Sequence, residues 1–117
     1  MNITIIGTGY VGLVTGTCFA EMGNTVTCVD IDQKKIDNLN KGVIPIYEPG
    51  LEKLIQENQK AGRLIFSTSL TEAMEKTKLF LIAVGTPESP SGEANMEYVY
   101  NVAREIGGNM ERESIIV

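Results

Sequence analysis

A glycine-rich turn near the N-terminus constrains this chain more than any other feature. The segment from Gly7 to Gly12, GTGYVG, follows a short apolar run and precedes a helical pattern that extends from Tyr10 to about Met22. We therefore predict a buried strand, a tight turn and a helix. Gly7 permits the sharp turn, Gly9 lets a ligand approach the backbone, and Gly12 allows the helix to pack closely on the strand.

The next element ends in a carboxylate at the place where a nucleotide-binding fold needs one. Residues 25–30 read as a second strand, and its last residue, Asp30, comes 18 positions after Gly12. In a parallel sheet this strand end and the glycine turn border one crevice, where N–H groups at a helix N-terminus bind phosphate. Asp30 is expected to accept hydrogen bonds from the adenosine ribose hydroxyls and to repel a 2′-phosphate, which favours NAD over NADP. The alternative is a tight turn that binds no ligand.

Two charged residues follow this carboxylate. Asp32 is predicted to be the N-cap of a helix that starts at Gln33. Lys35 falls in the first turn of that helix, where a cation opposes the helix dipole, so helix formation does not explain it. We interpret Lys35 as a contact to the adenosine end of the cofactor, with a solvated surface lysine as the alternative.

The remaining chain alternates strand and helix patterns. An irregular connection at 40–49 leads to a helix from Pro49 to about Lys60, and a strand at 64–67 leads to a capped helix at 69–76. A fully buried strand is expected at 78–84, followed by a loop containing Thr86, a helix after Asn95 and a strand from residue 114. An apolar stripe on the first helix is predicted to face the core: Val11, Val14, Cys18 and Met22. Cys28, in the second strand, is also predicted to lie in the core.

This alternation predicts an α/β fold, a Rossmann-type doubly wound parallel sheet in the order 3-2-1-4-5. Residues 1–117 form one domain, and the pattern stops inside the fifth strand. We expect a truncated domain from a longer protein, with the sixth strand missing. The unpaired apolar edge would invite pairing between copies, so a homo-oligomer is expected.

Composition excludes several classes of function. The net charge is −5 and the 10 Lys and Arg residues are scattered, which argues against a nucleic-acid partner. There is no histidine for acid–base or triad chemistry, and the two cysteines match no metal-site spacing, so no metal is expected. No membrane span or signal peptide is recognisable, so a cytoplasmic protein is expected.

Four linked segments resemble the N-terminal NAD-binding domain of the UDP-glucose/GDP-mannose dehydrogenase family. They are Gly7–Leu13 (GTGYVGL), Val29–Asp32 with Lys35, Gly42–Leu51 (GVIPIYEPGL) and Val84–Pro87 (VGTP). The resemblance covers the whole chain in order, and residues 45–51 look most like the family members that act on UDP-glucose.

The resemblance implies an NAD-dependent oxidoreductase that oxidises a nucleotide sugar twice. The C6 hydroxyl becomes an aldehyde and then, through a cysteine thiohemiacetal, a carboxylate. The family's catalytic residues lie beyond Val117, so this chain alone is expected to be inactive, and neither of its cysteines matches the nucleophile. The resemblance assigns only cofactor contacts: Gly7, Gly9, Tyr10, Val11, Gly12, Asp30, Lys35 and Thr86.

Other interpretations remain at this point. The chain could be a non-catalytic Rossmann module that senses a nucleotide and regulates a partner. It could also belong to a dehydrogenase for another sugar nucleotide, such as UDP-N-acetylmannosamine or GDP-mannose. A methyltransferase that binds S-adenosylmethionine shares the glycine turn and the ribose carboxylate, but it fits the segments at 7–12 and 84–87 poorly.

Overall fold

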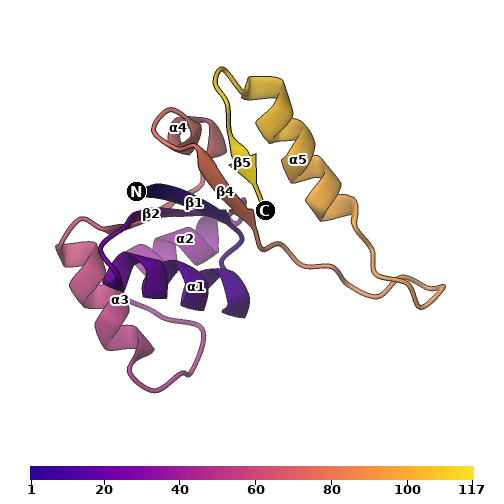
Figure 1. The fold of residues 1–117 in the computed structure, drawn as a ribbon. Helices are drawn as coiled ribbons and strands as arrows, with labels where there is room; N and C mark the ends of the chain where they lie inside the picture. The colour runs from indigo at the N-terminus through magenta and orange to yellow at the C-terminus, as the bar shows by residue number, and fades with distance from the viewer.

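Five parallel strands form one sheet in the order β3-β2-β1-β4-β5, as the sequence predicts (Figure 1). The structure is a computed structural model that describes all residues, 1–117. The strands are β1 (Asn2–Ile6), β2 (Thr25–Val29), β3 (Leu64–Ser67), β4 (Leu79–Ile82) and β5 (Ile115–Ile116). The helices are α1 (Tyr10–Glu21), α2 (Gln33–Asn40), α3 (Leu51–Lys60), α4 (Leu70–Met74) and α5 (Glu97–Asn109).

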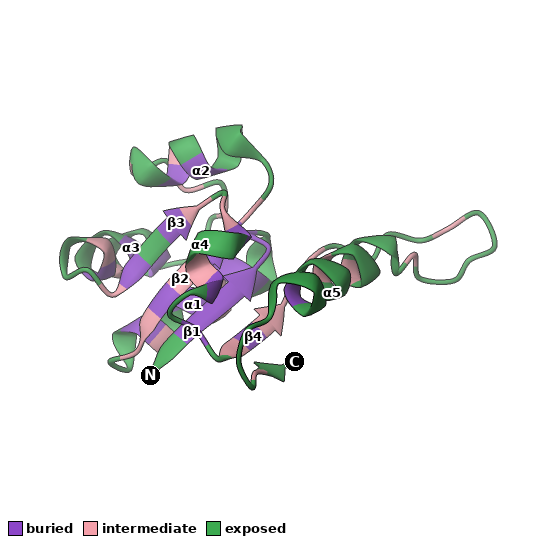
Figure 2. Cartoon of the chain, turned by 90° about the horizontal axis from the view of Figure 1, so that it is seen from above, coloured by how far each residue is buried: buried purple, intermediate pink, exposed green.

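The sheet carries an apolar cluster on each face because successive strand side chains point to opposite sides. Ile3 and Ile5 of β1 belong to the cluster under α1, α2 and α3, whereas Ile6 belongs to the cluster under α4 and α5. Both clusters lie at the centre of the molecule, where the strands are most buried (Figure 2). The strand order places β1 between β2 and β4, so the crossover direction reverses at β1, and open α/β sheets bind ligands outside the carboxyl ends of the strands at such a point.

Helix α1 buries a different face from the one predicted. Val11 and Met22 are 66% and 76% exposed and Cys18 is exposed, so these three members of the predicted stripe are wrong, whereas Val14 is half-buried and packs against the core. Of the two cysteines predicted to lie in the core, only Cys28 is buried. The helix instead turns its smallest residues to the sheet. A Cβ on Gly16 would lie 2.7 Å from the sulfur of Cys28, so only glycine permits this close approach. The buried residues of α1 are Gly12, Leu13, Gly16, Thr17 and Ala20.

The strand expected at 78–84 is shorter and less buried than predicted. β4 includes four residues, of which only Phe80 is buried. On its outer side β4 is covered only by the short β5, which pairs with Leu79 and Phe80, and by Val117, whose carbonyl accepts from the amide of Ile82. Two helix boundaries also differ. Pro49 lies outside α3, because the helix begins only after Gly50, which has a left-handed conformation (φ 83°). α4 ends at Met74, before the predicted end at residue 76.

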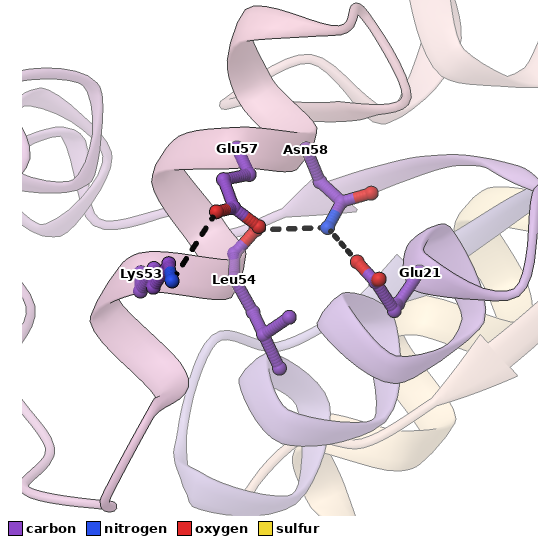
Figure 3. A network of polar contacts seen from close by, with 5 residues as sticks. All are labelled: Glu21, Lys53, Leu54, Glu57 and Asn58. Atoms are coloured by element: carbon purple, nitrogen blue, oxygen red, sulfur yellow. Dashed lines mark hydrogen bonds and ion pairs between the residues drawn. The ribbon is translucent and has the colours of Figure 1, made fainter.

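A polar network joins α1 to α3. The side-chain amide of Asn58 donates to a carboxylate oxygen of Glu21 and to the carbonyl of Leu54, each at 2.8 Å (Figure 3). Its amide oxygen accepts from Arg63, which also donates to the carbonyl of Ala20. Asn58 is fully buried, so these bonds satisfy a polar group inside the core and fix α3 beside α1.

Candidate functional site

The glycine turn has the close contacts that the sequence pattern predicts. Gly7 has φ 113°, and its amide donates to the carbonyl of Val29 at 2.7 Å, which ties the turn to β2. A Cβ on Gly7 would overlap the carbonyl oxygen of Ala83, and a Cβ on Gly12 would overlap the carbonyl oxygen of Gly7. The turn is therefore packed against both β4 and α1, and it tolerates no side chain at either glycine.

Gly9 faces open space instead. A Cβ there would meet no atom within 4 Å. The carbonyl of Gly9 accepts the first hydrogen bond of α1, from Leu13, whereas the amides of residues 9–12 have no acceptor within the chain. Unpaired N–H groups at the start of a 12-residue helix favour an anion, through hydrogen bonding and through the helix dipole. This free space and these donors fit a phosphate group.

The carboxylate of Asp30 lies next to this turn and is held by three hydrogen bonds. The amide and the hydroxyl of Thr8 both donate to its Oδ2, at 3.1 and 2.6 Å, and the amide of Asp32 donates to its Oδ1 at 3.0 Å. Asp30 follows β2 directly, and Val29 is in register with Ile6, so the sheet brings the carboxylate to the level of the glycine turn. Its side chain is half-buried and stays accessible from the crevice.

These surroundings keep Asp30 ionised. Burial favours the neutral acid, but the hydrogen bonds from Thr8 and Asp32, together with the positive charge of Lys35, outweigh it and lower the pKa of Asp30. Lys35 lies in the first turn of α2, as predicted, and is exposed. The carboxylate of Asp32 accepts hydrogen bonds from the amides of Lys34 and Lys35, which confirms its role as the N-cap of α2.

The other predicted contacts, Tyr10, Val11 and Thr86, have exposed side chains. Tyr10 and Val11 begin α1 with exposed side chains, so they can offer only their backbone amides to a bound phosphate. Thr86 is exposed in the loop after β4 and forms no hydrogen bond. Since Ala83 and Val84 pack against Gly7, this loop starts beside the glycine turn, but the cofactor contact of Thr86 stays a prediction.

Sequence reasoning missed two residues at this site. Thr8, only 2% exposed, holds Asp30. Glu48, in the connection between α2 and α3, accepts a hydrogen bond from the hydroxyl of Tyr10 at 2.7 Å. The glycine motif is defined by the spacing of its glycines and assigns no role to Thr8. No local sequence pattern indicates that Glu48 approaches α1.

No group of three or more His, Cys, Asp or Glu side chains is placed to hold a metal ion. None of the helices combines the length and the apolar character needed to cross a bilayer.

Comparisons with known proteins agree on one group. The family model for the UDP-glucose/GDP-mannose dehydrogenase family, NAD binding domain, matches residues 1–117. A UDP-glucose 6-dehydrogenase of Bacillus subtilis is 49% identical over 117 residues, which are 100% of this chain and 27% of that protein. A GDP-mannose 6-dehydrogenase of Azotobacter vinelandii is 41% identical over 121 residues, covering 100% of this chain and 28% of that protein.

Solved structures share the fold closely. The crystal structure of a ternary complex of GDP-mannose dehydrogenase from Pseudomonas aeruginosa superposes with a TM-score of 0.93 at 38% identity, covering 99% of this chain and 27% of that one. The UDP-N-acetyl-mannosamine dehydrogenase from Staphylococcus aureus gives 0.88 at 33% identity, with 99% and 28% covered. The chain thus spans about a quarter of the length of these relatives.

Proposed function

Because the chain belongs to the UDP-glucose/GDP-mannose dehydrogenase family, as its NAD-binding domain, we propose that it is the cofactor-binding part of a UDP-glucose 6-dehydrogenase. The observation that supports this proposal is that two features lie side by side at the carboxyl ends of β1 and β2. The unpaired amides at the start of α1 suit a pyrophosphate, and the ionised carboxylate of Asp30 suits a ribose hydroxyl. The open space at Gly9 leaves room for the pyrophosphate between them.

The residues of this chain bind and orient the cofactor. Bound NAD supplies a hydride acceptor for the oxidation of an alcohol carbon. The amides of residues 9–12 hold the phosphates, Asp30 accepts from the ribose, and Lys35 lies beside Asp30 at the adenosine end. Thr86, exposed in the loop after β4, is assigned the remaining contact to the cofactor. We therefore assign this chain the binding of the cofactor.

UDP-glucose is the substrate that the comparisons favour for the whole protein. Identity is 49% to a UDP-glucose 6-dehydrogenase and 41% to a GDP-mannose 6-dehydrogenase. Oxidation of the C6 alcohol to a carboxylate removes four electrons, so each UDP-glucose would reduce two NAD. A cytoplasmic location and a homo-oligomer, both expected from the sequence, remain part of this proposal.

Two measurements test the proposal. Calorimetric titration of the chain should show saturable binding of NAD and weaker binding of NADP, because Asp30 repels a 2′-phosphate. The complete gene product should form two NADH per UDP-glucose and should turn over UDP-N-acetylmannosamine and GDP-mannose more slowly. No NAD binding by the chain would refute the cofactor assignment, and faster turnover of another nucleotide sugar would refute the substrate.

A further inference from the structure

The carboxylate of Asp30 has little hydrogen-bonding capacity left for a ligand. An ionised carboxylate offers about four acceptor positions, two on each oxygen. Thr8 occupies two on Oδ2 with its amide and its hydroxyl, and the amide of Asp32 occupies one on Oδ1. About one position therefore remains free, and it lies on Oδ1.

Thr8 itself is hidden from any ligand. Thr8 is 2% exposed, although it lies within the turn between β1 and α1. The hydroxyl lies 2.6 Å from Oδ2 of Asp30, which is a short distance typical of a hydrogen bond to an ionised acceptor. Any effect of Thr8 on cofactor binding must therefore pass through the position and the charge of Asp30.

We propose that Thr8 is a positioning and specificity residue for the cofactor: it fixes one oxygen of Asp30 so that the other presents a single acceptor position to one ribose hydroxyl. This inference rests on the proposed NAD site. A fixed carboxylate receives a hydroxyl donor well, but it cannot turn away from a 2′-phosphate, which brings negative charge and no such donor. Thr8 thus contributes to the preference for NAD over NADP.

The charge of Asp30 depends on the same contacts. Thr8 faces it from the glycine turn, Lys35 faces it from α2, and Asp32 directs its own carboxylate to the amides of α2. On the side of β3 the contact is a backbone hydrogen bond from Asp30 to the carbonyl of Ser67, which carries no charge. Loss of the Thr8 hydroxyl should therefore let Asp30 take up a proton at a higher pH.

The test compares Thr8→Val, which replaces the hydroxyl with a methyl group, with Thr8→Ser, which keeps the hydroxyl. Thr17→Val is the matched control, because the Thr17 hydroxyl is equally buried but donates to the carbonyl of Leu13 inside α1. Calorimetry with NAD and with NADP gives both affinities. Carbon NMR of the Asp30 carboxyl group in the cofactor-free chain gives its titration directly.

Thr8→Val should bind NAD about tenfold more weakly and NADP about as well as the unaltered chain, so the preference should fall about tenfold. Asp30 should titrate at a higher pH in this variant, whereas Thr8→Ser and Thr17→Val should behave as the unaltered chain does. If Thr8→Val does not fold, Thr8→Ala removes the same hydroxyl without a second methyl group, and the same results are expected.

An unchanged NAD affinity and Asp30 titration in Thr8→Val would overturn the inference. Equal losses of NAD affinity in Thr8→Val and Thr17→Val would also overturn the inference. A Thr8→Ser variant that binds NAD as weakly as Thr8→Val would overturn it as well. Failure of the unaltered chain to bind NAD would overturn the proposed function and this inference together. If Asp30→Ala weakens NAD binding while Thr8→Val does not, only the role of Thr8 is refuted.

Discussion

The hydroxyl of Tyr10 donates a hydrogen bond to a carboxylate oxygen of Glu48 at 2.7 Å, although the two residues are 38 positions apart. Tyr10 is the first residue of α1, and the carbonyl of Glu48 accepts from the amide of Leu51, the first residue of α3. The hydrogen bond to Glu48 and its negative charge raise the pKa of Tyr10. The contact therefore fastens the connection between α2 and α3 to the start of α1, beside the glycine turn.

Removing this hydroxyl should loosen the connection. In Tyr10→Phe the ring remains but the hydrogen bond is lost, so the amide of Leu51, which donates to the carbonyl of Glu48, should exchange with deuterium a few times faster, as expected for one exposed hydrogen bond. Tyr47→Phe is the control, because Tyr47 is 93% exposed and its hydroxyl has no partner. Equal exchange in Tyr10→Phe and the unaltered chain would show that the contact does not hold the connection.

Asp30→Ala should weaken NAD binding by about 1.5–3 kcal/mol, because a hydrogen bond to an ionised carboxylate is lost. Calorimetric titration measures this directly. Asp37→Ala is a suitable control, since Asp37 is exposed in α2 and its side chain accepts only from Gln33. Equal NAD affinity in Asp30→Ala and the unaltered chain would remove Asp30 from the site.

Two glycines of the turn should respond differently to alanine. Gly12→Ala should lower the free energy of unfolding by about 1–3 kcal/mol or more, because the new Cβ overlaps the carbonyl oxygen of Gly7. Gly9→Ala should change it by no more than about 1 kcal/mol, yet weaken NAD binding at least about tenfold, because its Cβ enters the space assigned to the pyrophosphate. Urea unfolding and calorimetry separate these effects; a Gly9→Ala variant that binds NAD normally would contradict the assignment.

Cys28 should make stability depend on pH in the alkaline range. Burial raises the pKa of its thiol from 9.0 to about 12. The folded state holds this proton more tightly than the unfolded state does, so the stabilisation is complete below about pH 9. It is lost as the pH rises towards 12, by about 1.4 kcal/mol per pH unit. Urea unfolding from pH 8 to 11 should show this loss.

The two cysteines provide the control for that measurement. The slope should be smaller in Cys28→Ala and unchanged in Cys18→Ala, because Cys18 is exposed. In the folded chain at pH 8, Ellman's reagent should react with one thiol, and with both only after unfolding. Equal slopes in all three proteins would show that Cys28 does not control the pH dependence.

The edge of the sheet at β5 should promote association. Ile115 and Ile116 are 64% and 43% exposed, and β5 pairs only with β4, so its outer backbone groups and apolar side chains are free. Ile116→Lys should shift the chain towards monomer in sedimentation velocity at high concentration. Met22→Lys, an equally drastic change at a residue that is 76% exposed on α1, should not. A purely monomeric unaltered chain would refute this expectation.

The sequence alone determined the order of the elements and most of their bounds. The glycine spacing, the β-branched strand residues and the N-caps are local signals, since each depends on neighbours within one turn or one strand. They predicted the strand order, the sharp turn at Gly7, the close packing at Gly12 and the placement of Asp30 at the end of β2, all of which the structure confirms. The cofactor contacts assigned to Lys35 and Thr86 remain predictions.

Only the tertiary structure decided which groups meet. The apolar spacing predicted an inner face for α1 that included Val11, Cys18 and Met22, but the helix packs on the sheet through Gly12 and Gly16, because backbone can approach there without a side chain between. The bonds of Thr8 to Asp30 and of Tyr10 to Glu48 join residues 22 and 38 positions apart. Such pairs leave no local pattern in the sequence. They form only when the pairing of the parallel strands and the packing of the helices have brought the residues at the carboxyl ends of the strands together.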